Sequence, residues 1–313
     1  MADTTTLSVS GARTGGRRRR STRSALVPAT MLAPTLIATG VVIAFPVVVV
    51  LVESFFDVRP SHHPGWRWTG LGNFREIVSD ADLHGVLWNS VVWTLGSVVL
   101  QFLLAFATAL IVRAALQGRA WTWLRSLYVL PWATPMIVGA LSWKWLYEPQ
   151  YGLLDNALRG MGLDRIALPW LSDPHTALPA VLVTNVWRGF PFIMVMLLSG
   201  MAAIPDDIYE AAQVDGADGF RRTLHITLPL LRPTIMLSTL MSLIWTFNNF
   251  SLIYVMTGGG PAGKSDILTT YVYKNAFTRF DFGYASALSV VLFVIVTLGS
   301  FAYVRLLGKD ALT

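Results

Sequence analysis

One stretch of this sequence matches a phosphate-binding pattern. Residues 258–265 read Gly-Gly-Gly-Pro-Ala-Gly-Lys-Ser and satisfy the spacing G-x-x-x-x-G-K-S, in which backbone amides cradle phosphates and the lysine reaches the terminal ones. That chemistry requires a strand before the loop and a helix after it. Here an apolar segment of membrane-spanning length precedes the loop, and the topology inferred below places it outside the cell, away from ATP. We therefore expect no nucleotide site, and a membrane-anchored nucleotide-binding enzyme is the less favoured alternative.

The remaining reactive residue types do not assemble into a catalytic or metal-binding pattern. The chain has no cysteine, which excludes disulfides, thiolate metal sites and cysteine catalysis. His62 and His63 are adjacent but lack a third ligand nearby, so a solvated loop is expected there rather than a metal site. No Ser/His/Asp or paired-carboxylate arrangement is indicated by the spacing. The sequence predicts neither an enzyme nor a resident cofactor or metal.

Polar residues inside the apolar segment 232–256 are more informative. Polar groups within a membrane are costly and tend to face a bundle interior or a cavity. Hydroxyl and amide groups beside aromatic rings suit a sugar, which offers hydroxyls and apolar C–H faces. Hydrogen bonding between helices uses the same residue types and remains an open alternative. The residues that share one helical face by the 3, 4 and 7 spacing are Ser242, Trp245, Thr246 and Asn249.

Composition identifies the elements that must position these groups as membrane helices. The chain is 54% apolar and only 13% charged, whereas about a quarter of the residues of soluble domains are charged. A helix needs about 20 residues to cross the hydrocarbon core. Continuous uncharged runs favour helices over a membrane barrel, whose strands alternate. The predicted spans are residues 27–53, 85–112, 124–146, 178–203, 232–256 and 284–307.

Basic residues predict the orientation of these spans. Arginines cluster before the first span, at Arg13, Arg17–Arg20 and Arg23, and the short loop after the second span carries basic residues without an acid. The positive-inside rule then places both termini in the cytoplasm. The formal charge of +6 is mostly this topology signal, and without a folded basic surface we expect no nucleic-acid partner. The predicted organisation is a disordered basic segment, 1–25, and one membrane domain, 26–313.

The connector 204–230 between the fourth and fifth predicted spans has its own local signals. Pro205 lies at the start of a predicted short helix, and Asp207 with Glu210 is spaced as a capping box. Gly216 permits a left-handed turn after that helix. On these grounds alone, the connector either caps the protein or docks onto a partner.

The connector also carries a family resemblance. Its Glu210-Ala211-Ala212, Gly216 and Ile226-Thr227-Leu228-Pro229 resemble the cytoplasmic loop by which membrane subunits of bacterial ABC importers grip their ATPase. From about residue 27 the chain resembles the first permease subunit of carbohydrate ABC importers, the maltose- and glycerol-phosphate-type group. Supporting stretches are 70–74, 187–192, 247–250 and 257–261. The resemblance implies an all-α, six-span permease fold with a coupling helix, and ATPase-coupling roles for Glu210, Ala211, Ala212, Asp215, Gly216, Ile226, Leu228 and Pro229.

The resemblance further implies a substrate site and partners. Sugar contacts of the maltose-type relative map to Gly189, Phe192, Ser242, Trp245, Thr246 and Asn249. Thr246 stands where that relative has an amide and Phe192 where it has a tyrosine, so the hydrogen-bond pattern differs. Implied partners are a second homologous permease, two ATPase subunits that bind ATP and Mg, an external sugar-binding protein and membrane lipid, at the prokaryotic cytoplasmic (inner) membrane. A non-sugar solute such as glycerol phosphate is the alternative; a secondary carrier fits less well because the spans lack interior carboxylates.

Overall fold

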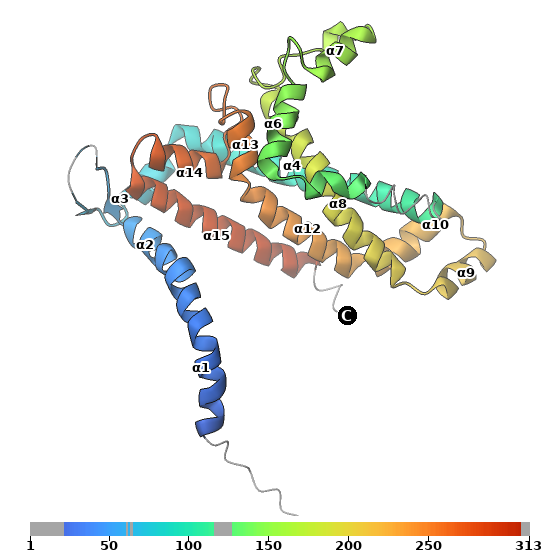
Figure 1. Cartoon of the computed structure of the whole chain (residues 1–313), viewed down its shortest axis with the longest axis horizontal. Coiled ribbons are helices and arrows are strands. Elements are labelled where there is room, and N and C mark those ends of the chain that lie inside the picture. Colours follow the sequence, from blue (N-terminus) through green and yellow to red (C-terminus); the bar gives the residue numbers. More distant parts are fainter. Residues whose placement is uncertain (1–21, 61, 63–64, 116–126, 308–313) are drawn as a thin grey trace, which may run out of the picture. The chain divides into compact units, whose positions relative to one another are not determined.

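The computed structural model describes residues 22–60, 62, 65–115 and 127–307, and helices dominate them (Figure 1). The chain divides into two compact units, Met1–Val49 and Val50–Thr313. The predicted disordered segment 1–25 lies mostly outside the described residues. The last four residues of that segment, 22–25, lie in helix α1 (Thr22–Thr39).

The first predicted span, residues 27–53, is helical along its whole length. Helix α1 continues into the π-helical segment η1 (Gly40–Ala44) and then α2 (Phe45–Glu53). Backbone angles at both junctions stay in the right-handed helical region. Residues Met31–Glu53 are long and apolar enough to cross a membrane.

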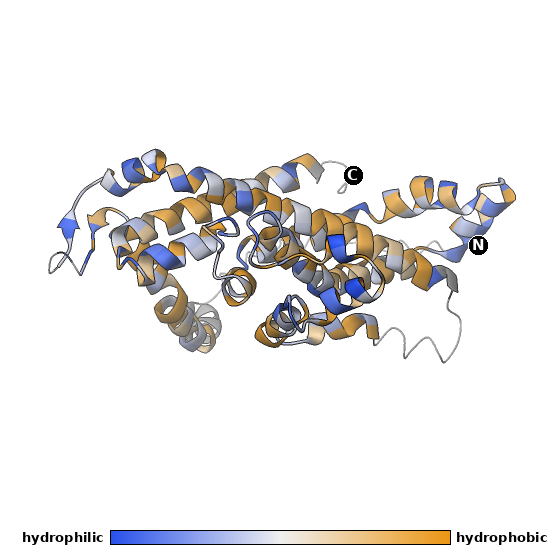
Figure 2. Cartoon of the chain, turned by 90° about the horizontal axis from the view of Figure 1, so that it is seen from above, coloured by the Kyte–Doolittle hydropathy of each residue, from blue (hydrophilic) through white to orange (hydrophobic). Residues whose placement is uncertain are grey.

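Three long helices match the second, fourth and sixth predicted spans. They are α4 (Ala81–Ala115), α8 (Ala177–Ala202) and α15 (Phe282–Leu307). Helix α4 packs along α8, and the fully buried Ala105 and Ala109 of α4 lie in the same core as Ile193 and Leu197 of α8. Small residues at this interface allow the two backbones to approach closely. Figure 2 shows apolar residues predominating along the long helices and hydrophilic residues gathering in short helices and connections.

The third and fifth predicted spans are not continuous helices. Residues 127–133 are helical, the helix is interrupted at Thr134 and Pro135, and α6 (Met136–Leu146) follows. Pro135 has an extended ψ of 135°, and a proline cannot donate the amide that a continuous helix needs. By contrast, Pro191 lies inside the single helix α8.

The fifth predicted span breaks after α12 (Arg232–Phe247) and resumes as α13 (Phe250–Met256). Among the described residues, four helices are long and apolar enough to cross a membrane. A fifth is added if Gly219–Leu230 and Arg232–Phe247, bent by 70°, count as one span. The described residues therefore contain four or five candidate spans, and the count of six stays a prediction. Breaks at Thr134–Pro135 and at Asn248–Asn249 interrupt segments that hydropathy alone treats as continuous.

The connections contain shorter elements. Strands β1 (Phe56–Asp57) and β2 (Arg67–Trp68) pair antiparallel, with Phe56 opposite Trp68. They precede α3 (Gly72–Ser79), which packs against α15. Further along are α7 (Leu153–Gly160), the 3-10 turn η2 (Asp164–Ile166) and α14 (Leu268–Phe277), the last lying against α15. The connector 204–230 forms α9 (Asp206–Val214), α10 (Gly219–Arg222), the π-helical segment η3 (Thr223–Thr227) and α11 (Leu228–Leu230).

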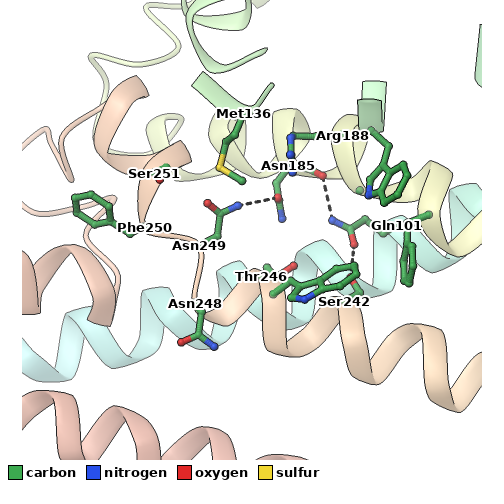
Figure 3. Close-up of a pocket in the computed structure, with 14 residues that line it drawn as sticks. Gln101, Met136, Asn185, Arg188, Ser242, Thr246, Asn248, Asn249, Phe250 and Ser251 are labelled. Carbon is green, nitrogen blue, oxygen red and sulfur yellow. Dashed lines mark hydrogen bonds between the residues drawn. The ribbon is translucent and has the colours of Figure 1, made fainter. Parts of the chain in front are cut away.

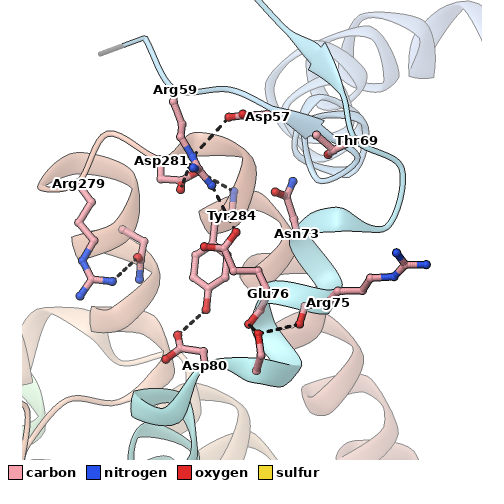
Figure 4. A network of polar contacts seen from close by, with 12 residues as sticks. Asp57, Arg59, Thr69, Asn73, Arg75, Glu76, Asp80, Arg279, Asp281 and Tyr284 are labelled. Carbon is pink, nitrogen blue, oxygen red and sulfur yellow. Dashed lines mark hydrogen bonds and ion pairs between the residues drawn. The ribbon is translucent and has the colours of Figure 1, made fainter. Parts of the chain in front are cut away.

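A polar network ties α3, α4, α14 and α15 together at one end of these helices (Figure 4). Asp80 accepts a hydrogen bond from Tyr284 at 2.5 Å. It also accepts from Tyr271 at 2.6 Å and from the Asp82 amide at the start of α4. Arg59 lies 2.8 Å from an oxygen of Asp281, the residue before α15. Burial opposes ionisation of Asp80, but hydrogen bonds from the tyrosine hydroxyls and from backbone amides together outweigh it and lower its pKa.

Candidate functional site: a polar and aromatic cavity

A cavity of about 460 Å³ lies among α8, α12, the break after α12, and the segment around Pro135. Its size falls within the range of small-molecule sites. The structure brings all six predicted substrate residues to this one cavity. Its lining consists of Gln101, Trp132, Met136, Asn185, Arg188, Gly189, Phe192, Ser242, Trp245, Thr246, Asn248, Asn249, Phe250 and Ser251.

Gln101 of α4 joins three helices beside the cavity (Figure 3). Its Oε1 accepts a hydrogen bond from Ser242 Oγ of α12 at 2.5 Å, and its Nε2 donates to the Asn185 carbonyl of α8 at 3.0 Å. Sequence reasoning missed this residue. A buried amide in the middle of an otherwise apolar span was the available signal, because such a group needs partners inside the bundle.

Gly189 provides the space that Gln101 occupies. A β-carbon built on Gly189 would overlap the amide of Gln101. The predicted substrate role of Gly189 is therefore accompanied by a packing role, which is the close approach of one helix to a side chain of another.

Asn249 reaches the cavity for a different reason from the one predicted. The face formed by Ser242, Trp245 and Thr246 is helical, but α12 ends at Phe247 and Asn249 lies after the break. Its Oδ1 caps α13 by accepting from the Leu252 amide at 3.3 Å. Its Nδ2 faces Asn185 Oδ1 of α8 at 3.4 Å (Figure 3). The spacing of seven residues between Ser242 and Asn249 therefore does not place them on one helical face, although Asn249 does line the cavity.

Three aromatic rings form an apolar wall of the cavity. Phe192 of α8 lies between Trp245, with ring centroids 4.8 Å apart, and Trp132, with centroids 6.1 Å apart. Trp245 is 52% exposed, so part of its ring faces open space. Exposed aromatic surface beside amide and hydroxyl groups is the combination that saccharide rings require.

Arg188 contributes the only formal charge among the residues that line this cavity. It stands one helical turn from Asn185 on α8, and both appear beside the amide cluster in Figure 3. In the described part of the chain, no hydrogen-bond partner is found for Arg188 Nε or for Asn185 Nδ2. Buried donors without acceptors are rare in proteins.

The phosphate-loop pattern does not form a nucleotide site. Helix α13 precedes it where a strand is required, and four of its residues, Gly258, Gly259, Ala262 and Gly263, have positive φ. Ser265, whose hydroxyl would hold a metal ion in a phosphate loop, is fully buried and bonds to the Gly260 carbonyl and the Thr257 hydroxyl. The serine stabilises the turn itself.

The short helix α9 of the connector ends in a Schellman motif, in which the Ala217 amide donates to the Ala212 carbonyl and the Gly216 amide to the Gln213 carbonyl. Gly216 has φ +75°, as its predicted left-handed turn requires. The predicted capping box is wrong: α9 begins at Asp206 after Pro205 and has no side-chain cap.

The predicted coupling residues do not all face the same way. Glu210, Ala211, Asp215 and Pro229 are exposed, whereas Ala212 is buried and Ile226 and Leu228 are half-buried. The apolar side chains of Val214 and Phe220 are 88% and 75% exposed. The connector therefore presents both acidic and apolar groups outward, while Ala212 packs inward.

Arg113 in the last turn of α4 braces α9 against the long helices. It donates to the Met201 carbonyl of α8 at 3.0 Å and to the Tyr209 hydroxyl of α9 at 3.1 Å. Its guanidinium also lies 4.2 Å from the centre of the Tyr209 ring. The Tyr209 hydroxyl is in turn 3.1 Å from that of Thr227. A displacement of α9 would therefore act directly on α4 and α8 through these contacts.

Comparison with known proteins gives consistent matches. A family model described as the inner membrane component of binding-protein-dependent transport systems matches residues 101–309. A probable ABC transporter permease of Brucella suis is 33% identical and covers 90% of this chain and 96% of its own. The trehalose/maltose transport permease of Thermococcus litoralis is 34% identical, covering 88% and 91%. A bacterial ABC transporter for import of the acidic polysaccharide alginate shares the fold, with TM-score 0.80, 21% identity and coverage of 92% and 96%.

Proposed function

We propose a saccharide-transport function for this chain, which belongs to the family of binding-protein-dependent transport system inner membrane components. It forms half of the membrane path of an ATP-driven ABC importer, and it receives a sugar or oligosaccharide from an external binding protein. The observation that carries the proposal is the cavity in which amides, hydroxyls and aromatic rings converge from α4, α8, α12 and the helix breaks. Relatives with named sugar substrates support the same solute class.

The breaks in the predicted third and fifth spans support a transport path. In the proposed topology, residues 127–146 and 232–256 each cross the membrane as two shorter helices, giving six crossings with both termini in the cytoplasm. Irregular backbone at membrane depth is tolerated where it lines a cavity or is buried in protein. Both interruptions contribute lining residues, Trp132 and Met136 at one and Asn248 and Asn249 at the other.

The proposed site for ATPase coupling is the outward surface of α9 and the turn after it. Glu210, Ala211 and Asp215 would contact a groove of the ATPase, in the manner of a helix laid into a groove. Arg113 and Tyr209 would then pass ATPase movement to α4 and α8. A second homologous permease would complete the path, and two ATPase subunits would bind ATP and Mg. Such a path alternates between outward and inward openings.

The test is uptake by the complete transporter, reconstituted in vesicles with its binding protein and measured with labelled saccharide. Trp245→Ala is expected to lower uptake at least several-fold while the complex stays assembled, because it removes the exposed ring of the cavity. Trp145→Ala on α6 is the matched control, since this tryptophan is 62% exposed and lies outside the cavity lining. If both variants took up the saccharide as fast as the unmodified transporter, the solute path would not run past Trp245.

A further inference from the structure

The hydrogen bonds around the cavity engage its buried acceptors. The amide oxygens of Gln101, Asn185 and Asn249 accept from Ser242, from Asn249 and from the Leu252 amide respectively. The fourth lining amide, Asn248, is exposed, and its nitrogen donates back to the Ile244 carbonyl. Each oxygen of the buried amide cluster therefore already accepts one hydrogen bond from within the chain.

In the part of the chain that the structure describes, the buried polar groups around the cavity that lack a hydrogen-bond partner include two N–H donors. Asn185 is only 4% exposed, and its Nδ2 has no hydrogen-bond partner among the described residues, although its Oδ1 is held by Asn249. Arg188 Nε is likewise buried and without a partner there. The two side chains lie three residues apart on α8, hence on the same face. Both residues line the cavity, and neighbouring atoms cover these two N–H groups in the chain without a solute.

The charge balance points the same way. Among the described residues that line the cavity there is no aspartate or glutamate, and Arg188 is the one cation. A positive charge removed from water is costly unless an anion accompanies it. A guanidinium with free N–H groups matches the planar or tetrahedral oxygens of carboxylate, sulfonate and phosphate.

We propose that the saccharide carried by this path bears an oxyanion, which lies against Arg188 and Asn185 while the sugar ring lies on the wall formed by Trp132, Phe192 and Trp245. This inference rests on the proposed function and specifies its substrate class. The competing arrangement is a carboxylate of the second permease that neutralises Arg188 and leaves the cavity to neutral sugars. The two arrangements differ in what the assembled complex binds.

The experiment measures binding to the assembled permease–ATPase complex in detergent, without the binding protein, by thermal stabilisation over a concentration series. The probes are glucose, glucuronate and glucose 6-phosphate, which share a ring and differ in charge. We expect both anions to bind at least about tenfold more tightly than glucose, corresponding to one charge-assisted contact. The preferred anion then distinguishes a carboxylate from a phosphate substrate.

Variants of Arg188 connect that preference to the cavity. Arg188→Gln should remove the preference for anions and leave glucose binding within about twofold, and Arg188→Lys should keep part of it. Lys144→Gln on α6 removes one positive charge outside the cavity lining and should leave the preference intact. If the glutamine variant fails to assemble, the lysine variant carries the test, because it keeps the charge and loses the planar contact.

The inference is overturned if no anionic sugar binds better than glucose, or if Arg188→Lys and Arg188→Gln weaken neutral and anionic sugars equally. Failure of complex assembly in both variants, together with equal binding in the unmodified complex, would assign Arg188 to the second permease. These outcomes differ from failure of the proposed function, for which Trp245→Ala would leave uptake unchanged.

Discussion

Gln101 on α4 occupies the space that a side chain on Gly189 of α8 would need. A β-carbon at Gly189 overlaps the Gln101 amide, and that amide holds Ser242 and the Asn185 carbonyl. Because Gly189 has no side chain, Gln101 of α4 can hydrogen-bond to both α8 and α12 at the cavity.

Replacing Gly189 by alanine should therefore displace Gln101. We expect lower uptake and a loss of about 1–3 kcal/mol of stability, the usual cost of overpacking, measured by thermal unfolding of the assembled complex. Gly299→Ala on α15 is the control, because a β-carbon there meets nothing within 4 Å. Gln101→Ala added to Gly189→Ala should restore stability without restoring uptake. An unchanged melting temperature in Gly189→Ala would contradict this account.

The turn at Gly216 should control coupling without affecting the membrane helices. Its φ of +75° costs a side-chain-bearing residue about 1–2 kcal/mol, and a β-carbon there meets no atom within 4 Å, so backbone strain is the only penalty. Gly216→Val should insert normally and lose ATPase co-purification or solute-stimulated hydrolysis. Gly219→Ala serves as the control, since that glycine has no positive φ. Unchanged solute-stimulated ATP hydrolysis in Gly216→Val would mean that the connector only caps the membrane helices and does not couple them to the ATPase.

The docking surface itself is better tested at Ala211 than at Ala212. Ala211 is exposed, whereas Ala212 is buried within the connector, so a large residue at Ala212 would damage the chain's own packing. Ala211→Trp should block ATPase association by steric exclusion while the melting temperature of the isolated permease stays close to that of the unmodified chain. Normal ATPase association in this variant would place the contact on another face of α9.

The proposed topology predicts opposite labelling at two exposed residues, and the chain has no native cysteine to interfere. A cysteine at Lys264 should react with an impermeant thiol reagent in intact cells, because the loop after α13 lies outside. A cysteine at Gln213 on α9 should react only after the membrane is opened. The reverse pattern would invert the topology.

The network around Asp80 should make stability depend on pH. Burial raises the pKa of Asp80, but hydrogen bonds from Tyr271, Tyr284 and backbone amides together outweigh burial, so the pKa is lowered in the folded chain. The ionised form is therefore the stabilised one, so its contribution is complete above the unfolded pKa of about 3.9 and is lost as pH falls through the folded value. Asp80→Asn should cost roughly 1–3 kcal/mol at pH 7, measured by thermal unfolding.

The same comparison at lower pH supplies the check on that prediction. The difference between Asp80→Asn and the unmodified protein should begin to shrink as the pH falls below about 4, and it should reach its minimum below the folded pKa of Asp80, where the carboxyl is protonated in both states. Asp164→Asn, in the exposed turn η2, should change stability little at either pH. A difference that persists undiminished in acid would assign the effect to packing rather than to charge.

Local physics explains what could be predicted from the sequence. Spans of about 20 apolar residues are imposed by the thickness of the bilayer, and α4, α8 and α15 follow them closely. The turn at Gly216 is equally local, because glycine is the residue that enters left-handed backbone at little cost. The grouping of Ser242, Trp245 and Thr246 followed from helical periodicity alone.

The arrangement of the cavity depended on tertiary contacts. Gln101 lies 141 residues from Ser242, and Asn185 lies 64 from Asn249, so the periodicity of either segment contains no information about its partner. Hydropathy could not reveal that α12 ends at Phe247, because an interrupted apolar segment and a continuous one have the same composition. Sequence alone therefore determined that the chain crosses a membrane and which residue types face its interior. Only the packing of α4, α8 and α12 decided which amide groups are satisfied within the chain and which N–H groups remain for a solute, since hydrogen bonding depends on distance in space rather than along the chain.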